Sequence, residues 1–165
     1  PSGVVALGKT KAAWIPAMAG SVPTISELWA ATATNLSFYI PGGEFPLDVT
    51  QNTGQDVRLG SVQVYDVLGQ KSYQIPDINY IADIQTPGTT TPAFLMTDGA
   101  TGFIIIRYGI LASTDWTIGQ KVDSFPVTLG ARTKGKTSAD EFGKFVYVQK
   151  AVVSGPANFD VAIAS

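Results

Sequence analysis

The sequence contains no cysteine and no histidine among its 165 residues. This excludes disulfide bonds, thiolate nucleophiles, Ser-His-Asp triads, zinc sites built from imidazole or thiolate, and histidine acid/base chemistry. Carboxylates remain, but they are scattered singly, and the one adjacent pair, Asp140 and Glu141, lies in a polar segment typical of a solvated surface loop. We therefore predict that the protein is not an enzyme and binds no cofactor or metal.

Strong charge and long apolar runs are also missing. The chain has 11 basic and 13 acidic residues, a formal net charge of −2, and no polybasic face that could hold phosphates. Its longest strongly apolar run, residues 103–106, is far too short to span a bilayer, and the N-terminal residues lack the pattern of a signal peptide. We expect a cytoplasmic product with no membrane insertion and no specific binding of nucleic acid.

The phosphate-binding P-loop pattern occurs twice, at residues 3–10 and 130–137. A true P-loop lies between a buried strand and a long helix that points its N-terminus at the phosphates. Pro16 would interrupt the helix after the first match. After the second, Gly143 interrupts, and the β-branched and aromatic residues 145–148 favour a strand. We interpret the first match as chance and residues 130–142 as a solvated, basic hairpin loop.

Glycine, proline and threonine are plentiful, a mixture typical of short strands joined by turns. We predict a single all-β domain spanning residues 1–165, a sandwich or barrel of about eight strands with one short helix. The expected strands lie at residues 8–16, 35–40, 56–67, 70–84, 103–110, 120–129, 143–153 and 159–165. Alternation such as Val62 and Val64 against Gln63 and Tyr65 indicates a half-buried antiparallel sheet.

The expected helix begins with a capping box, in which Thr24 and Glu27 satisfy each other's backbone N–H groups. It places Ile25, Leu28 and Trp29 on one side, as a lid on the sheet. One more helical turn is expected at residues 92–96, because proline is tolerated at a helix start.

Two other features need a structural explanation. Arg107 lies inside the most apolar strand, so it requires a carboxylate partner or an exit to solvent or to another subunit. Residues 41–55 are rich in glycine and proline and are predicted to form a long loop, a feature that commonly has a function.

The order of "KAAWIP", "PTISELWAA", "LSFYI", "TGFIIIRYG", "GQKVDSFPVTLGARTK" and "FVYVQKAVVSG" resembles the tail tube (major tail) proteins of long-tailed, siphovirus-type bacteriophages, in particular those of actinobacteria. The resemblance covers nearly the whole chain. It implies a structural virion protein, assembled in the host cytoplasm, whose hexameric rings stack into the tail tube. Such a tube conducts double-stranded DNA into the host without binding it specifically. The implied partners are other copies, a tape measure protein in the lumen, and tail terminator and distal tail proteins.

Two loops are the predicted ring-to-ring contacts under this resemblance, and acidic residues are expected to line the bore, where they would repel the phosphate backbone. The first comprises Gly42, Gly43, Glu44, Phe45, Pro46, Asp48, Gln51 and Asn52; the second comprises Arg132, Lys134, Lys136, Asp140 and Glu141.

Two rival functions remain. One is another virion structural protein, such as a head decoration or tail completion protein. The other is a carbohydrate-binding β-sandwich, in which tryptophans would stack on sugar rings. For that role Trp116 is the candidate, since Trp14 and Trp29 are predicted to pack in the core.

Overall fold

The computed structural model describes residue 3 and residues 5–41, 48–60 and 62–165. These residues form nine strands and two one-turn helices, so the all-β prediction is confirmed. The elements are β1 (Thr10–Ile15), α1 (Ile25–Leu28), β2 (Thr34–Asn35), β3 (Asp48–Asp56), β4 (Tyr65–Gln74), β5 (Ile78–Ile81), α2 (Pro92–Leu95), β6 (Thr101–Tyr108), β7 (Lys121–Lys136), β8 (Phe145–Val153) and β9 (Asn158–Ala162).

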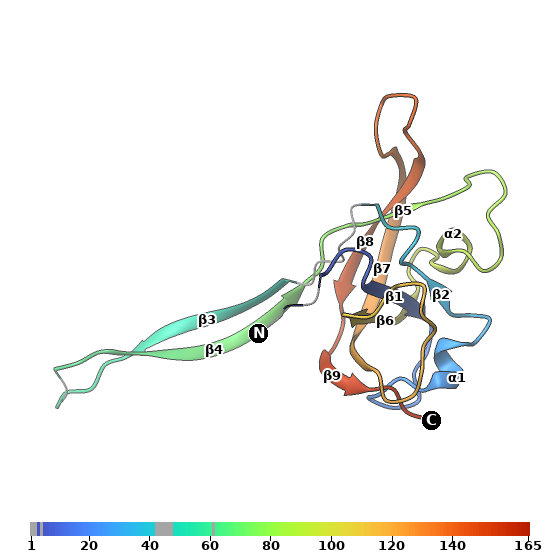
Figure 1. Ribbon diagram of the computed structural model, residues 1–165. Helices are drawn as coiled ribbons and strands as arrows, with labels where there is room; N and C mark the ends of the chain where they lie inside the picture. The colour runs from blue at the N-terminus through green and yellow to red at the C-terminus, as the bar shows by residue number, and fades with distance from the viewer. Residues whose placement is uncertain (1–2, 4, 42–47, 61) are drawn as a thin grey trace.

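Seven of the strands form one antiparallel sheet in the order β2-β1-β6-β7-β8-β5, with β9 paired to β7 beside this path. The sheet curls into a half-barrel, and the long strand β7 runs through it (Figure 1). Successive side chains of a strand point to opposite faces of the sheet. Both faces of this sheet carry an apolar cluster, so both are covered. Ile104 and Ile106 belong to one apolar cluster and Ile105 to the other, which explains the continuous apolar run in β6.

The first face packs under α2 and the turn after β2, and the second packs under α1 and the loop before β7. Gly102 in β6 is required by this packing, because a Cβ there would lie 2.5 Å from the Ile15 carbonyl oxygen and 2.6 Å from the Trp14 ring. The prediction that Trp14 lies in the core is confirmed.

Helix α1 has the predicted capping box. The Thr24 N–H donates to Glu27 Oε2 over 2.8 Å, and the Glu27 N–H donates to Thr24 Oγ1 over 3.4 Å. Leu28 is buried and Ile25 half-buried against the second cluster, as expected. Trp29 differs from the prediction, since 61% of it is exposed. The helix is a single turn, and Trp29 follows it as the C-cap residue, outside the packed face.

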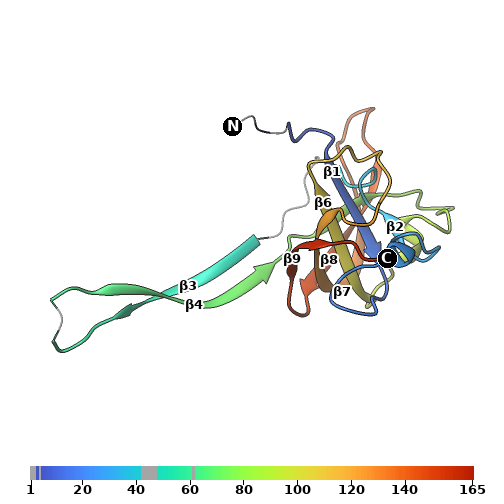
Figure 2. The same cartoon turned by 60° about the horizontal axis from the view of Figure 1, so that its bottom comes forward.

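The sequence prediction was wrong for most of the described residues between 36 and 64. Residues 36–40 form a turn instead of a strand, residues 48–56 are a strand instead of a loop, and residues 57–64 connect β3 to β4. β3 and β4 form a separate two-stranded hairpin that projects far from the half-barrel (Figures 1 and 2). Val62 and Val64 are exposed, not half-buried, because no other described segment packs over this end of the hairpin.

Two further boundaries are corrected. The predicted strand 70–84 is divided between β4 and β5, and Pro76 lies in the link between them. β7 continues to Lys136, so residues 130–136 are extended; they pair with β8 from Arg132 onward, after a bulge at residues 130–131, and the turn follows Lys136. The interpretation of residues 130–142 as a hairpin loop therefore holds only for the turn after Lys136, and the P-loop interpretation stays rejected, since Gly135 pairs with Val146 in a sheet and no helix follows it in the described residues.

Candidate assembly surfaces

The β3–β4 hairpin is held together by its own ladder, from Asp48 opposite Gln74 to Asp56 opposite Tyr65, with a bulge between Gln51 and Thr53. Of the first predicted interface set, Gly42, Gly43, Glu44, Phe45 and Pro46 lie outside the described residues. Asp48, Gln51 and Asn52 lie in β3, and Gln51 Nε2 donates to the Gly69 carbonyl across the hairpin over 3.0 Å. These residues therefore belong to a projecting arm instead of a loose loop.

The end of the hairpin is apolar, and the sequence analysis missed this. Leu59 and Val62 are fully exposed, and Val57 is mostly exposed. Between them Arg58 pairs with Asp56, the guanidinium NH2 lying 2.9 Å from the carboxylate. These three aliphatic residues were visible in the sequence, but they lay in a segment assigned to a half-buried strand because Val62 and Val64 alternate with Gln63 and Tyr65.

The base of the arm contacts the half-barrel through an aromatic pair. The rings of Tyr73 in β4 and Phe159 in β9 lie 6.0 Å apart between centroids. Such tilted pairs contribute about 0.5–1.5 kcal/mol. The arm therefore has one aromatic anchor at its base, while the rest of it projects into solvent.

The second predicted interface set is divided by the structure. Arg132 lies in β7 with its guanidinium 4.5 Å from the centre of the Tyr147 ring, and its NH1 donates to the Ala93 carbonyl over 2.7 Å. Its Nε lies 3.3 Å from Asp98. Arg132 thus holds α2 against the sheet within its own subunit.

The other four residues of that set are exposed at the far end of the β7–β8 hairpin. Lys134 and Lys136 lie in β7, and Glu141 lies in the turn. Asp140 shapes this turn: it accepts hydrogen bonds from Ser138 Oγ over 2.6 Å and from the Phe142 N–H over 3.0 Å. The Ser138 hydroxyl, followed by the Phe142 N–H, lowers the pKa of Asp140.

Arg107 has no carboxylate within ion-pair distance among the described residues, and it does not reach solvent. It is fully buried, and its two terminal nitrogens donate to the carbonyls of Leu111, Thr114 and Asp115 and to Gln120 Oε1, over 2.8–3.1 Å. Burial lowers its pKa, and the nearby Asp115 carboxylate opposes that effect. Arg107 thus organises the loop between β6 and β7 from within, mainly through backbone oxygens.

That loop brings Trp116 into the core, where it is 7% exposed, so the expectation of an exposed Trp116 was wrong. The Arg107 guanidinium and Lys11 Nζ each lie 5.1 Å from the centre of its ring. Lys11 Nζ also donates to the Thr114 carbonyl over 2.9 Å, and burial, followed by Arg107, lowers the Lys11 pKa. A sugar-stacking role for Trp116 is therefore excluded by its burial.

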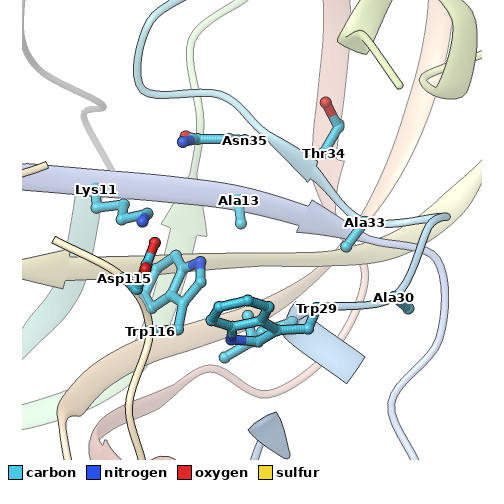
Figure 3. Close-up of a pocket in the computed structure, with 10 residues that line it drawn as sticks. Lys11, Ala13, Trp29, Ala30, Ala33, Thr34, Asn35, Asp115 and Trp116 are labelled. Carbon is cyan, nitrogen blue, oxygen red and sulfur yellow. The ribbon is translucent and has the colours of Figure 1, made fainter. Parts of the chain in front are cut away.

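An open hollow of about 270 Å³ lies beside this cluster, between α1, β1, β2 and the loop before β7. Figure 3 shows Trp29 beside Trp116, with Lys11 and Asp115 at one end and the Thr34–Asn35 strand across from them. Leu28, Ala30 and Ala33 complete the apolar wall. The exposed Trp29 ring therefore lies at the rim of a depression that is part apolar and part polar.

A scan against protein-family models matches this chain over residues 1–165 to the family described as phage tail tube protein. The chain belongs to the phage tail tube protein family. A search of curated proteins gave no match. The tail tube resemblance seen in the sequence is thereby confirmed, and the protein is a structural component of a phage tail.

Within the described part of the chain, no three carboxylates are grouped in a way that could hold a metal ion. The described helices are single turns, none of them of a length and hydropathy that would cross a bilayer. The tail tube protein presents exposed apolar side chains at the end of its projecting β3–β4 hairpin.

Proposed function

We propose that this protein forms hexameric rings that stack into the phage tail tube, through which double-stranded DNA passes during ejection into the host cell. The supporting observation is the β3–β4 arm on a member of the tail tube family, because the exposed apolar side chains at the end of this long hairpin are not covered by the described part of their own subunit. In this proposal the arm joins successive rings.

Ring closure is proposed to use the late strands. Exposed large apolar side chains occur in β8 and β9, including Phe145, Val152 and Phe159. A β-rich protein avoids indiscriminate aggregation when its sheet edges pair with or pack against neighbours in a closed ring. The sixfold number follows from the family resemblance, and the β7–β8 turn with Lys136, Asp140 and Glu141 is a second proposed contact between rings.

The bore is proposed to be acidic or neutral. The chain has a net charge of −2 and no polybasic face, so a lumen lined by unpaired carboxylates would repel DNA phosphates and allow passage without specific binding. The proposed further partners are the tape measure protein in the lumen and the tail terminator and distal tail proteins at the two ends. Assembly is proposed to occur in the host cytoplasm before the tube becomes part of the virion.

Electron microscopy of the purified protein at high concentration tests the proposal. We expect tubes with sixfold rings in which the arm spans two rings. Cryo-electron microscopy of the native particle that placed this chain on the head surface would contradict the tube role, and a basic bore would contradict the electrostatic argument.

A matched variant tests the arm itself. Asp48 and Gln74 are opposite each other at the base of the hairpin, so a short Gly-Ser linker can replace residues 49–73 without separating the ends. This removes the Tyr73–Phe159 pair but nothing of the two apolar clusters. We expect a folded subunit with an unchanged sheet signature in circular dichroism and no tubes. Tubes from this variant would show that the arm is dispensable.

A further inference from the structure

We propose that the hollow beside Trp29 is the acceptor for the β3–β4 tip of a second copy of this chain in the adjacent ring. The tip is defined here as Val57, Leu59 and Val62, and the hollow by Leu28, Trp29, Ala30 and Ala33 with Trp116 behind them. This inference rests on the proposed stacking of rings, and it names the surface that receives the arm.

The side chains of the tip are suited to binding in an apolar depression. Leu59 and Val62 are fully exposed, so covering them gains the full transfer free energy of two aliphatic side chains. The ion pair between Arg58 and Asp56 neutralises the charge of the tip internally. The tip can therefore enter a partly apolar site without bringing an unpaired charge.

The hollow has the matching chemistry. An exposed tryptophan beside a depression is an unusual feature for a soluble subunit, and aromatic residues of this kind commonly anchor protein interfaces. The volume of about 270 Å³ has room for branched aliphatic side chains. Lys11 is occupied by the Thr114 carbonyl, so the polar end of the hollow is partly satisfied before any partner binds.

The positions of tip and hollow fit a head-to-tail assembly. In both views of the molecule the arm leaves the half-barrel on one side, while α1 and β2, which border the hollow, lie on the opposite side (Figures 1 and 2). An open stack requires two different surfaces that face in opposite directions, because a donor and an acceptor on the same side would close a dimer. The tip and the hollow meet this requirement.

Disulfide trapping tests the pair directly, since the natural chain contains no cysteine. The test protein is the full chain with Leu59→Cys and Ala30→Cys, both exposed positions, assembled into tubes and then oxidised. A disulfide forms only when the two Cβ atoms approach to about 4 Å. We expect a ladder of covalent oligomers on a denaturing gel that collapses to monomer on reduction.

Three controls make the ladder specific. The single variants Leu59→Cys and Ala30→Cys can give at most dimers. The matched pair Leu59→Cys with Ala139→Cys offers the tip another exposed alanine, in the β7–β8 turn, and it should not form a ladder. Tubes without a ladder from the 59/30 pair, or a ladder from the 59/139 pair, would overturn the acceptor assignment while leaving the tube function intact. Absence of tubes from the wild-type protein would instead contradict the proposed function.

Tryptophan fluorescence supplies a second readout that needs no cysteine. Trp14 and Trp116 are already buried, so a change on assembly reports Trp29. We expect a blue shift of the wild-type emission when tubes form and no shift for Trp29→Phe. Truncation by Trp29→Ala should raise the concentration at which tubes form by roughly tenfold or more, because a large apolar contact is lost. An unchanged emission on wild-type assembly would contradict the inference.

Discussion

At the residue scale, Arg107 shows how a buried cation can be stabilised without an ion pair. Three backbone carbonyls and one side-chain amide oxygen surround its terminal nitrogens, and the Trp116 ring lies against the guanidinium. Hydrogen bonds from a charged donor are stronger than neutral ones. Arg107 therefore makes the largest number of side-chain hydrogen bonds to the loop between β6 and β7, and Lys11 and Gln120 add to them.

Arg107→Met should strongly destabilise the subunit. The thioether fills part of the space but removes the four hydrogen bonds that the buried guanidinium donates, and hydrogen bonds that involve a charged group contribute about 1.5–3 kcal/mol each. We expect a loss of roughly 3 kcal/mol in the free energy of unfolding, measured by urea denaturation. Arg58→Met is the matched control: its ion pair is exposed, and the expected change is below about 1 kcal/mol. Equal losses from the two variants would refute this account of Arg107.

Glu27 gives the capping box a dependence on pH. Partial burial acts to raise its pKa, but hydrogen bonds from the N–H groups of Thr24 and Ala19 outweigh this, so the pKa lies below the ordinary value of 4.5. A depressed carboxyl pKa stabilises the folded state above pH 4.5, and this contribution is lost as the pH falls through the folded-state pKa.

Glu27→Gln should therefore lower the melting temperature at pH 7 and reduce its fall between about pH 5 and pH 3, with a cap contribution on the order of 1 kcal/mol. Melting followed by circular dichroism checks this, with Glu141→Gln, in the exposed β7–β8 turn, as the control. Identical pH profiles for the wild-type protein and Glu27→Gln would contradict the cap assignment.

At the element scale, the β3–β4 hairpin and β7 serve different purposes. β7 pairs with three strands and lies at the centre of the sheet. The hairpin pairs with itself and leaves its tip in solvent. Changes in the hairpin should therefore alter assembly and leave folding nearly unchanged, whereas changes in β7 should alter folding.

The double substitution Leu59→Ser and Val62→Ser tests this division. Both side chains are fully exposed, so the free energy of unfolding of the subunit should change by less than about 0.5 kcal/mol. Tube formation, followed by sedimentation, should require a concentration at least about tenfold higher, because the apolar contact is lost. Unimpaired tubes would show that the tip does not contribute to stacking.

The strand assignment of residues 130–136 gives a prediction about nucleotides. Lys136→Ala should leave the protein folded, since the lysine is exposed at the end of β7 and lies 5.6 Å from the Phe145 ring centre. Calorimetry with ATP or GTP should give no binding to either protein, because extended backbone cannot wrap a phosphate. Micromolar binding abolished by Lys136→Ala would overturn the assignment.

At the scale of the whole molecule, the low charge content determines how assembly responds to salt. Screening weakens exposed charge pairs, and only 15% of the residues are charged. Raising the ionic strength from about 0.1 M to about 1 M should change the concentration needed for tubes only modestly. Light scattering across that range checks this, and dissolution of tubes at high salt would indicate electrostatic contacts instead.

The fold was predictable where the residue types within a few positions determine the local structure. The capping box of α1, the end of β1 at Pro16, and the strands in residues 101–129 and 145–162 follow from residue types within a few positions. The hairpin was not predictable in its placement, because glycine and polar residues in β3 are typical of a loop, and the strand there is stabilised by β4 across it. The hollow was not predictable either, because the residues that line it come from segments far apart in the sequence.

The sequence alone determined that this protein is β-rich and lacks the side chains of most catalytic sites, because composition and alternation express those properties directly. Only the tertiary structure decided which tryptophan is exposed, how Arg107 is satisfied and where the arm projects. Trp116 is buried because the loop before β7 folds back over Arg107, and Trp29 is exposed because α1 ends after one turn. Burial depends on what lies opposite a side chain: Trp116 has Lys11, far away in the chain, against its ring, whereas Trp29 faces the open hollow.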